Sequence, residues 1–555
     1  MRNSLIVLLS ILCLPLFGQD EVIRSTTRLV QVGVVVKDKN GQPVTGLKRE
    51  NFTIFDAGQE QKIQLFSIET NTAPSGKDAS TLPAGTLTNR SSGFSGVPHN
   101  LTVVLIDTFN TLPTDHVKAR EAIIRFLEQI QPTDHVAIYA LGTKLTVLQD
   151  FTNDSKALVE AVKRYKATMS TAGAETAGEP AVGGGTTAPG DPLGAALFAL
   201  NQGVADMTQT IANFQTNLRA QESLRALEAI AGSLSGIPGR KNLIWVCGDF
   251  PLRIGYAAAG VDPKFRNLAD DMEKTARAVN AANIAIYPVD AAGLLGAPNI
   301  DSSNGTMSRT PGRIARGGIS PTGGDGLAER IDASATNTTV SIHAAMNELA
   351  DKTGGRAFYN TNDLFTSIRQ AVNDSQVTYM VSYSPTHNQW NGGFREIKVK
   401  VDKPGVQVLS RKGYLAVATD IVSDAQQRKA ALLQAAVAPV TSSGLGLKIR
   451  PVHQGSTLVT NIEIDMHEIG FELKNGKYEA LVDLFFVMRG KDGATLDQLH
   501  QPADLSLSPE DYKKLLPTGI GLSLPLPLPA GTARVRIVAR DSASGQVGSI
   551  DVPVN

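Results

Sequence analysis

The sequence predicts an α/β protein whose centre is a doubly wound, mostly parallel sheet of the kind covered by helices on both faces. An N-terminal β-hairpin module and a C-terminal β-sandwich are expected to flank it. Between residues 99 and 415, short and nearly continuous apolar runs alternate with helical segments, which is typical of parallel strands joined by helices. On either side of that region the chain shows strand patterns separated by Gly, Asn and Pro turns, which favour antiparallel strands.

The most informative stretch is LTVVLIDTFNT at Leu101–Thr111, an apolar run that Asp107 closes. In open α/β sheets, ligands bind in the crevice beyond the carboxyl ends of the strands. Asp107 and Thr111 are therefore the first candidates for a site, and we expect the Asp107 carboxylate at the rim of the sheet, facing solvent and a partner. The alternative is that Asp107 only caps the helix that follows, since Asp is a preferred cap.

Length and charge define the class of protein. A chain of 555 residues has room for about three or four domains. Hydrophobic residues make up 42% and charged residues 19%, which describes a globular protein. Lys+Arg and Asp+Glu both number 53, so no nucleic acid or anionic membrane surface is expected as a partner.

Residues 1–19 read as a secretory signal peptide, with a basic Arg2, an apolar core at Leu5–Phe17 and cleavage near Gly18 or Gln19. We therefore expect an exported protein, periplasmic, in the cell envelope or extracellular, with no membrane span after cleavage. Cys247 is then the remaining cysteine, so no intramolecular disulfide can form. Its apolar surroundings in LIWVCGDF predict a buried, inert thiol.

The regions outside the central sheet are expected as follows. Residues 26–70 predict a small β module of two hairpins, with an Asn-Gly turn at residues 40–41. Residues 71–98, rich in Ser, Thr, Gly and Pro, predict a linker. A connecting helix is expected at 423–436, and long strands predict a β-sandwich at 446–555, similar to immunoglobulin-like or fibronectin-like modules.

The central region, 99–415, predicts alternating strands and helices, with flexible insertions at about 169–190 and 294–336. Strands are expected at 101–107, 134–141, 144–151, 242–247, 283–290, 354–359 and 377–383, and helices at 114–130, 154–165, 192–234, 264–282, 341–353 and 362–375. The strands at 379–383, 394–402 and 406–414 either extend this sheet or form a small antiparallel module with the first hairpins, and the sequence does not choose.

In its order of strands the chain resembles a von Willebrand factor type A domain. LTVVLIDTFNT is followed by DHVAIYAL, NLIWVCGDFP, NIAIYPVD and then ELADKTGGRAFYNTNDL, which holds the Leu-Ala-x-x-Thr-Gly-Gly segment common in that family. The match is closest to the acidobacterial-type subfamily, in which a signal peptide and a hairpin module with a V-x-G-L-x-x-x-x-F segment precede the A domain. Residues 44–52, VTGLKRENF, fit that segment.

This resemblance implies a metal-ion-dependent adhesion site, where Mg²⁺ or Mn²⁺ offers an open position to an acidic group of a protein ligand. Such a cation wants about six oxygen ligands. Asp107 matches the first ligand of the family's Asp-x-Ser-x-Ser motif and Thr111 matches its last hydroxyl, while Phe109 replaces the first Ser. Phe109 and Asn110 lie in the same loop and are the expected partner contacts.

The other two ligand positions are weaker. Thr186 or Thr187 could supply the loop threonine. At the fourth strand Gly248 aligns with the ligand, and Asp249 reaches the site only if the strand bulges by one residue. The site is therefore expected to be degenerate.

Enzyme motifs such as G-x-S-x-G, a Walker loop and H-E-x-x-H are missing from the sequence. We expect an exported, non-enzymatic protein-binding, cell-adhesion or scaffold protein with a degenerate cation site. One alternative is a secreted or envelope structural protein with no metal site. Another is an uncharacterised hydrolase in the final region, which a cluster of titrating residues in one pocket would favour.

Overall fold

The structure is a computed structural model that describes residues 29–70, 83, 85–90, 101–166, 192–252, 267–294, 299–301, 306–308, 342–387, 391–417 and 425–554. The signal peptide expected at 1–19 and the insertion expected at 169–190 lie outside these residues. Most of the insertion expected at 294–336 does too, apart from its ends and the antiparallel pair β11 (Asn299–Asp301) and β12 (Thr306–Ser308). No helix in the described ranges is long and apolar enough to cross a membrane.

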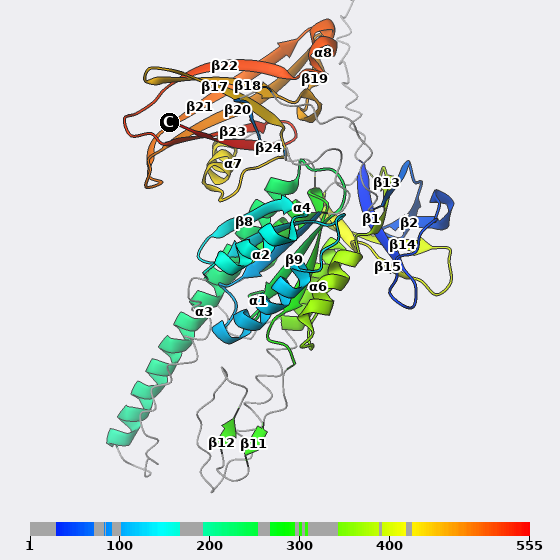
Figure 1. The fold of residues 1–555 in the computed structure, drawn as a ribbon, viewed down its shortest axis with the longest axis vertical. Helices are drawn as coiled ribbons and strands as arrows, with labels where there is room; N and C mark the ends of the chain where they lie inside the picture. The colour runs from blue at the N-terminus through cyan, green and yellow to red at the C-terminus, as the bar shows by residue number, and fades with distance from the viewer. Residues whose placement is uncertain are drawn as a thin grey trace, which may run out of the picture.

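A five-stranded sheet lies at the centre of the molecule (Figure 1), in the order β10-β9-β6-β7-β8. Four neighbouring strands are parallel, and β8 pairs antiparallel with β7 at the edge. In this doubly wound order the chain leaves in opposite directions from β6, so the switch point lies between β6 and β9. The strands are β6 (Leu101–Asp107), β7 (His135–Leu141), β8 (Leu145–Thr152), β9 (Lys241–Cys247) and β10 (Ile284–Asp290).

The prediction of a full strand at 354–359 was wrong. This segment instead makes a single parallel bridge, between Phe358 and Val289 of β10. Gly354 has a φ of +79°, which interrupts an extended run. A Cβ on Gly355 would lie 1.9 Å from the carbonyl oxygen of Ile286, so the backbone passes too close to β10 for a side chain.

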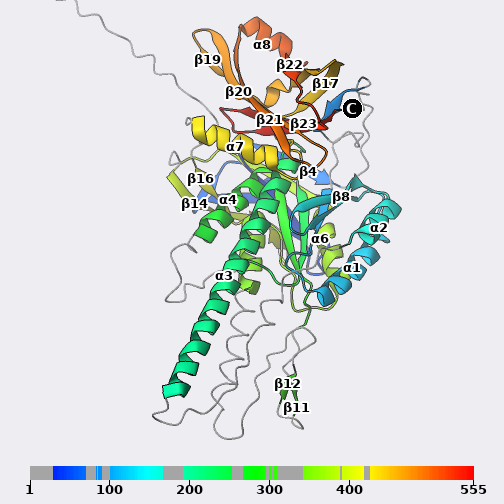
Figure 2. The ribbon, with the colours of Figure 1, turned by 90° about the vertical axis from the view of Figure 1, so that its left-hand side faces the viewer.

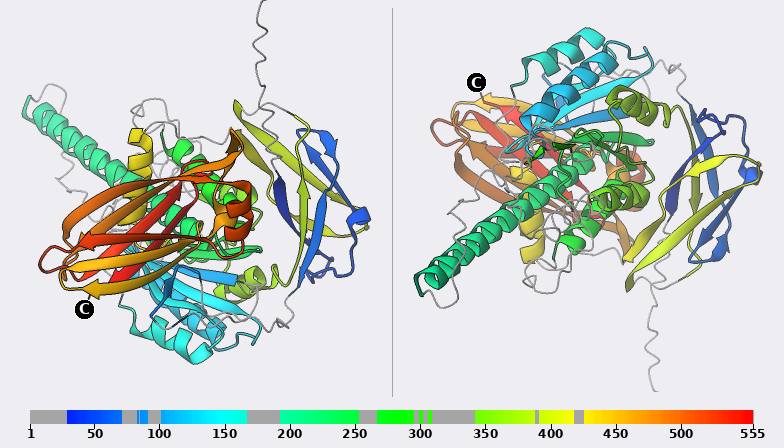
Figure 3. Two further views of the ribbon diagram at one scale, coloured as in Figure 1. Left: turned by 90° about the horizontal axis from the view of Figure 1, so that it is seen from above. Right: turned by 90° about the horizontal axis from the view of Figure 1, so that it is seen from below.

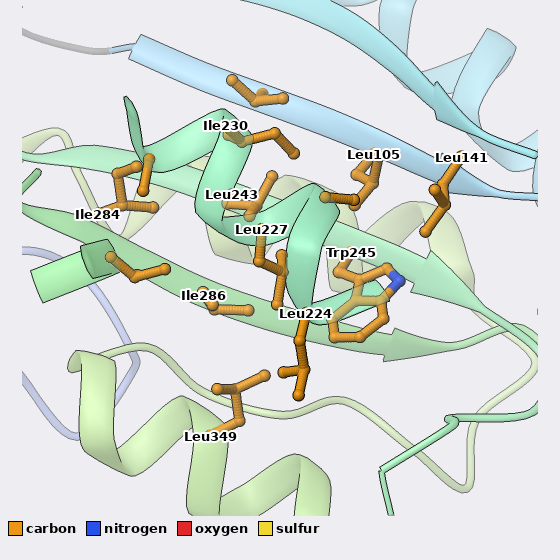
Figure 4. Close-up of a cluster of buried hydrophobic side chains, with 14 of the residues drawn as sticks. Leu105, Leu141, Leu224, Leu227, Ile230, Leu243, Trp245, Ile284, Ile286 and Leu349 are labelled. Atoms are coloured by element: carbon orange, nitrogen blue, oxygen red, sulfur yellow. The ribbon is translucent and has the colours of Figure 1, made fainter. Parts of the chain in front are cut away.

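Helices cover both faces of the sheet, because alternate residues of each strand point to opposite sides. On β6, Val103 and Leu105 belong to one apolar core, and Val104 and Ile106 to the other. Figure 4 shows the first core, where α3 side chains such as Leu227 lie over the sheet near Trp245. The first core is covered by α3 (Pro192–Leu234), α4 (Asn267–Ala281) and a helix at residues 342–353, the second by α1 (Pro113–Leu127), α2 (Ser155–Arg164) and α6 (Leu364–Asn373).

The strands after α6 do not extend the central sheet. Of the two arrangements that the sequence left open, the structure has the antiparallel module, in which these strands pair with the N-terminal ones. Two four-stranded sheets result, with the orders β15-β1-β13-β4 and β16-β14-β2-β3. The strands are β1 (Val30–Lys37), β2 (Phe52–Asp56), β3 (Gln59–Gln61), β4 (Leu65–Thr70), β13 (Val377–Tyr383), β14 (Asn391–Val401), β15 (Gln407–Leu409) and β16 (Gly413–Val417).

Arg240, just before β9, joins this module to the central sheet. Its guanidinium donates to the carbonyl oxygens of Gly33 at 3.4 Å and Gly354 at 2.6 Å, and to the Tyr287 hydroxyl at 3.3 Å. Its backbone N–H donates to Oε2 of Glu69 at 3.1 Å. Arg240 is buried, so these partners replace the water that a cation loses on burial.

Residues 445–554 form two antiparallel sheets around one apolar core, seen from above in Figure 3. Part of the expected linker belongs to them, because β5 (Leu87–Thr88) pairs with β17. The helix expected at 423–436 is α7 (Ala425–Val437), which packs against β20 and β23. The strands are β17 (Leu447–Gln454), β18 (Thr457–Ile464) and β22 (Ile520–Pro527) in one sheet, and β19 (Glu472–Lys474), β20 (Lys477–Arg489), β21 (Thr495–Leu507), β23 (Arg534–Asp541) and β24 (Val547–Pro553) in the other.

Candidate functional site

The candidate site lies at the carboxyl ends of β6 and β9, which are neighbours in the sheet at its switch point. Asp107 is the last residue of β6, and Gly248 and Asp249 follow directly after β9. The sheet order therefore brings together the candidate residues of two segments that are far apart in sequence.

The Asp107 carboxylate is buried and hydrogen-bonded on both oxygens. It is 1% exposed. Oδ1 accepts the backbone N–H of Asn110 at 2.9 Å, while Oδ2 accepts the Asn110 side-chain amide at 2.7 Å and the indole N–H of Trp245 at 2.9 Å. The expectation of a carboxylate at the rim facing solvent is therefore wrong, because donors from its own loop and from β9 enclose it.

Burial raises the pKa of Asp107 from 3.8 to about 6, although the hydrogen bonds from Asn110 and Trp245 lower it in part. Loss of water destabilises the charged carboxylate, and the donors restore part of that loss. The group thus carries its charge at neutral pH at some cost to the folded state.

Asn110 extends the network into α3. Its side-chain amide also donates to the hydroxyl of Ser223 at 3.0 Å, and Asn110 itself is 1% exposed. The Thr111 hydroxyl donates to the backbone oxygen of Asp107 and accepts the N–H of Gly248 at 3.0 Å. A buried Asn110 cannot touch a partner directly, so that expected contact is wrong.

The backbone of Asp249 is hydrogen-bonded to this network, and its carboxylate lies beside a positively charged side chain. Its N–H donates to the carbonyl oxygen of Asn110 at 2.7 Å. Its carboxylate lies 3.8 Å from the guanidinium of Arg219, whose side chain is buried on α3. The positive charge beside Asp249 is therefore supplied by the protein itself.

The half-buried ring of Phe109 packs against the first apolar core, and its expected role as a partner contact stays a prediction. The capping alternative for Asp107 does not hold. Helix α1 begins at Pro113, and its N-cap is Leu112, which makes no side-chain cap hydrogen bond. Thr186 and Thr187 lie outside the described residues.

These residues do not fit a hard divalent cation. Mg²⁺ or Mn²⁺ needs oxygen ligands with free lone pairs turned toward it. Both Asp107 oxygens instead face N–H groups, whose positive hydrogens would repel a cation, and Phe109 has no oxygen to give. Within the described ranges, no group of three or more His, Cys, Asp or Glu side chains could hold a metal ion.

Three residues of the site, Trp245, Ser223 and Arg219, were not predicted from the sequence. Trp245 and Ser223 lie on separate apolar elements, and Asp107 is separated by 138 residues from Trp245. The sequence offered one signal, which is the polar N–H of Trp245 inside an apolar run. A buried indole N–H needs a hydrogen-bond acceptor. Cys247 is buried as expected, and burial raises its pKa well above the ordinary value.

No protein-family model and no curated protein sequence matches this chain. Among solved structures it is similar to an aerotolerance-related membrane protein from Bacteroides fragilis, at 13% identity over 50% of this chain and 99% of that chain, with a TM-score of 0.23. A von Willebrand factor type A protein from Catenulispora acidiphila matches at 12% identity over 67% of this chain and 78% of that chain, with a TM-score of 0.26.

A minor pilin from Streptococcus sanguinis matches at 10% identity over 51% of this chain and 64% of that chain, with a TM-score of 0.26. TM-scores this low carry no argument about fold or function. The fold is instead indicated by the chain's own central sheet. Its four parallel strands and one antiparallel edge strand, covered by helices, fit a von Willebrand factor A-like fold.

Proposed function

We propose that this chain is an exported, non-enzymatic protein-binding or scaffold protein whose A-like domain works without a cation at Asp107. The observation that carries the proposal is the enclosure of the Asp107 carboxylate by Asn110 and Trp245. A cation that presents an open position to an acidic ligand needs an accessible carboxylate. Partner contacts therefore use surfaces other than the end of β6.

We also assign the chain to the acidobacterial-type subfamily on the strength of residues 44–52. Val44, Leu47 and Phe52 are buried in the core of the small β module, and Gly46 has a φ of +76°. The spacing V-x-G-L-x-x-x-x-F thus has a physical reason, since three apolar residues fill one core around a turn that favours glycine.

A hydrolase in the final region is not favoured by the polar cluster there. The Asp483 carboxylate accepts hydrogen bonds from the Ser542 hydroxyl at 3.1 Å and lies 2.9 Å from Nε2 of His500. Nucleophilic catalysis by serine needs the histidine between the hydroxyl and the carboxylate. Here both groups contact the carboxylate, so the described contacts do not place His500 beside the Ser542 hydroxyl as its base.

Calorimetric titration tests the cation part of the proposal. Mg²⁺ and Mn²⁺ titrated into the parent chain and the Asp107→Ala variant should give no saturable heat with either protein. Thermal unfolding of the parent should also be the same in EDTA and in Mg²⁺. Saturable heat with the parent that Asp107→Ala abolishes would refute it.

Cross-linking in intact cells tests the binding part. A lysine-reactive reagent should join the chain to the same envelope protein whether EDTA or Mg²⁺ is present. Loss of that product on chelation, or no product above the background of cells lacking the chain, would contradict the proposal. The mass of the recovered chain should also show cleavage near Gly18 or Gln19, as export requires.

A further inference from the structure

Helix α3 has two parts with different surroundings. It runs for 43 residues, about 65 Å at a rise of about 1.5 Å per residue. From Ala220 to Leu234 it packs on the central sheet. Its N-terminal part extends beyond the body of the molecule, as Figure 2 shows.

The extending part carries a row of large apolar side chains at alternating spacings of four and three residues. All of them are more than a third exposed. This row, which we name the α3 stripe, consists of Leu200 (64%), Val204 (39%), Met207 (67%), Ile211 (47%), Phe214 (64%) and Leu218 (44%). The same spacing continues in the sequence to Leu197 and Leu193.

The α3 stripe is not a continuation of the face that packs on the sheet. At about 100° per residue, its members lie on the side of the helix opposite to Ala220, Leu224 and Leu227. Its continuation toward the body is occupied by the charged pair Glu222 and Arg225. The central sheet therefore cannot cover the stripe, because that sheet lies behind the helix.

All six residues of the stripe are exposed in the part of the chain that the structure describes. A long helix draws most of its stability from an apolar face packed against something. A stripe of this length therefore predicts a partner helix.

The residue types along the stripe indicate which helix. In heptad terms Val204, Ile211 and Leu218 occupy the a positions, with Leu200, Met207 and Phe214 at d. Two of the three a residues, Val204 and Ile211, are β-branched, and β-branched residues at a with leucine at d favour parallel two-stranded coiled coils. Between 192 and 218 the one charged residue is Asp206, so two copies would meet without rows of like charge.

We propose that the α3 stripe pairs with the α3 stripe of a second copy of this chain, in register, as a parallel two-stranded coiled coil. The pairing buries the six side chains of each copy against the same six of the other. It also sets the two A-like domains side by side at the same end of the joined helices.

Sedimentation equilibrium of the full chain tests this proposal. The parent should show twice the mass of one chain at micromolar concentration. Ile211→Glu should raise the dimer dissociation constant by more than about 100-fold, because it places two unpaired carboxylates in the seam. Thr216→Glu, on the other side of the same helix, should leave the dissociation constant within about threefold of the parent.

A parent that stays monomeric at 100-fold higher concentration, or an Ile211→Glu variant as dimeric as Thr216→Glu, would overturn the proposal. Circular dichroism and the thermal transition of the body should be the same for both variants. If Ile211→Glu unfolds, Met207→Glu replaces it with the same expectation.

A single cysteine near the body tests the register. Under oxidising conditions the Leu218→Cys variant should give a disulfide-linked dimer, since two parallel helices in register place their copies of residue 218 together. Antiparallel pairing of the two stripes would place residue 218 of one helix against residue 200 of the other, and no disulfide would form. A dimer without this disulfide would thus refute the parallel pairing, and the buried Cys247 makes the parent chain the control.

Discussion

The two ends of the central sheet bury opposite charges in different ways. At the amino end, Arg240 donates to Gly33 in the small β module and to Gly354 after the helix at 342–353. At the carboxyl end, Asp107 accepts hydrogen bonds from its own loop and from β9. The amino end is thus a joint between parts of the molecule, and the carboxyl end is a closed network inside one part.

This difference shows that the edge of the sheet where α/β proteins usually bind ligands has no accessible carboxylate at Asp107. An accessible carboxylate at a switch point can hold a cation or contact a partner. Here N–H donors take both oxygens, and Arg219 supplies the positive charge beside Asp249. Burying charge at both ends costs stability unless each group is satisfied, so removing the partners should have measurable effects.

The largest effect is expected at the amino end. Arg240→Ala removes the donor of three buried hydrogen bonds and should lower the free energy of unfolding by about 3 kcal/mol or more. Urea unfolding followed by tryptophan fluorescence would measure it. Arg225→Ala, a change on the exposed helix surface, is the control and should cost less than about 1 kcal/mol. Equal losses of unfolding free energy in both variants would show that the Arg240 hydrogen bonds do not stabilise the contact between the small β module and the central sheet.

The next effect concerns the charge at the carboxyl end. The pKa of Asp107 is raised to about 6 in the folded state, above the ordinary 3.8, so the folded form binds the proton more tightly than the unfolded form between these values. The contribution of this group to stability is therefore complete below pH 3.8 and is lost as the pH rises through 6.

Relative to an Asp107→Asn variant, the parent should thus gain about 2 kcal/mol of unfolding free energy when the pH falls from 7 to 4. Parallel urea titrations of both proteins would show it, because groups that titrate elsewhere cancel in the difference. A pH-independent difference would mean that the carboxylate is not buried as described.

A smaller effect is expected for the indole donor. Trp245→Phe removes the hydrogen bond to Oδ2 of Asp107 and should cost about 1–3 kcal/mol at pH 7, part of it from lost packing against Phe250. In the Asp107→Asn background the cost should be smaller, since the acceptor is then uncharged. A double-mutant cycle measures this coupling, and additive losses would show that the hydrogen bond contributes nothing.

The strands of the central sheet could be predicted from the sequence because each is an apolar run long enough to be buried on both faces. Leu101–Asp107 begins and ends where the pattern placed it. The irregular backbone at 354–359 could not be predicted, because the close approach of Gly355 to β10 depends on the tertiary structure. The same holds for β5, a two-residue strand in a stretch whose composition predicts a linker.

The site was predictable in position but not in state. Strand order alone brings Asp107 near Asp249, whereas the exposure of Asp107 depends on Trp245 and on Ser223 of α3, both distant in sequence. An apolar strand gives no sign that its one tryptophan donates into a carboxylate. Sequence patterns place side chains on a face, but long-range hydrogen bonds decide whether a charge there meets solvent.

Anomalous diffraction from crystals grown with Mn²⁺ tests the closed carboxyl end most directly. We predict no anomalous peak within coordination distance of Asp107 or Asp249, with Asn110 and Trp245 still donating to the carboxylate. A peak there, with the Asp107 oxygens turned away from these donors and toward the ion, would contradict it.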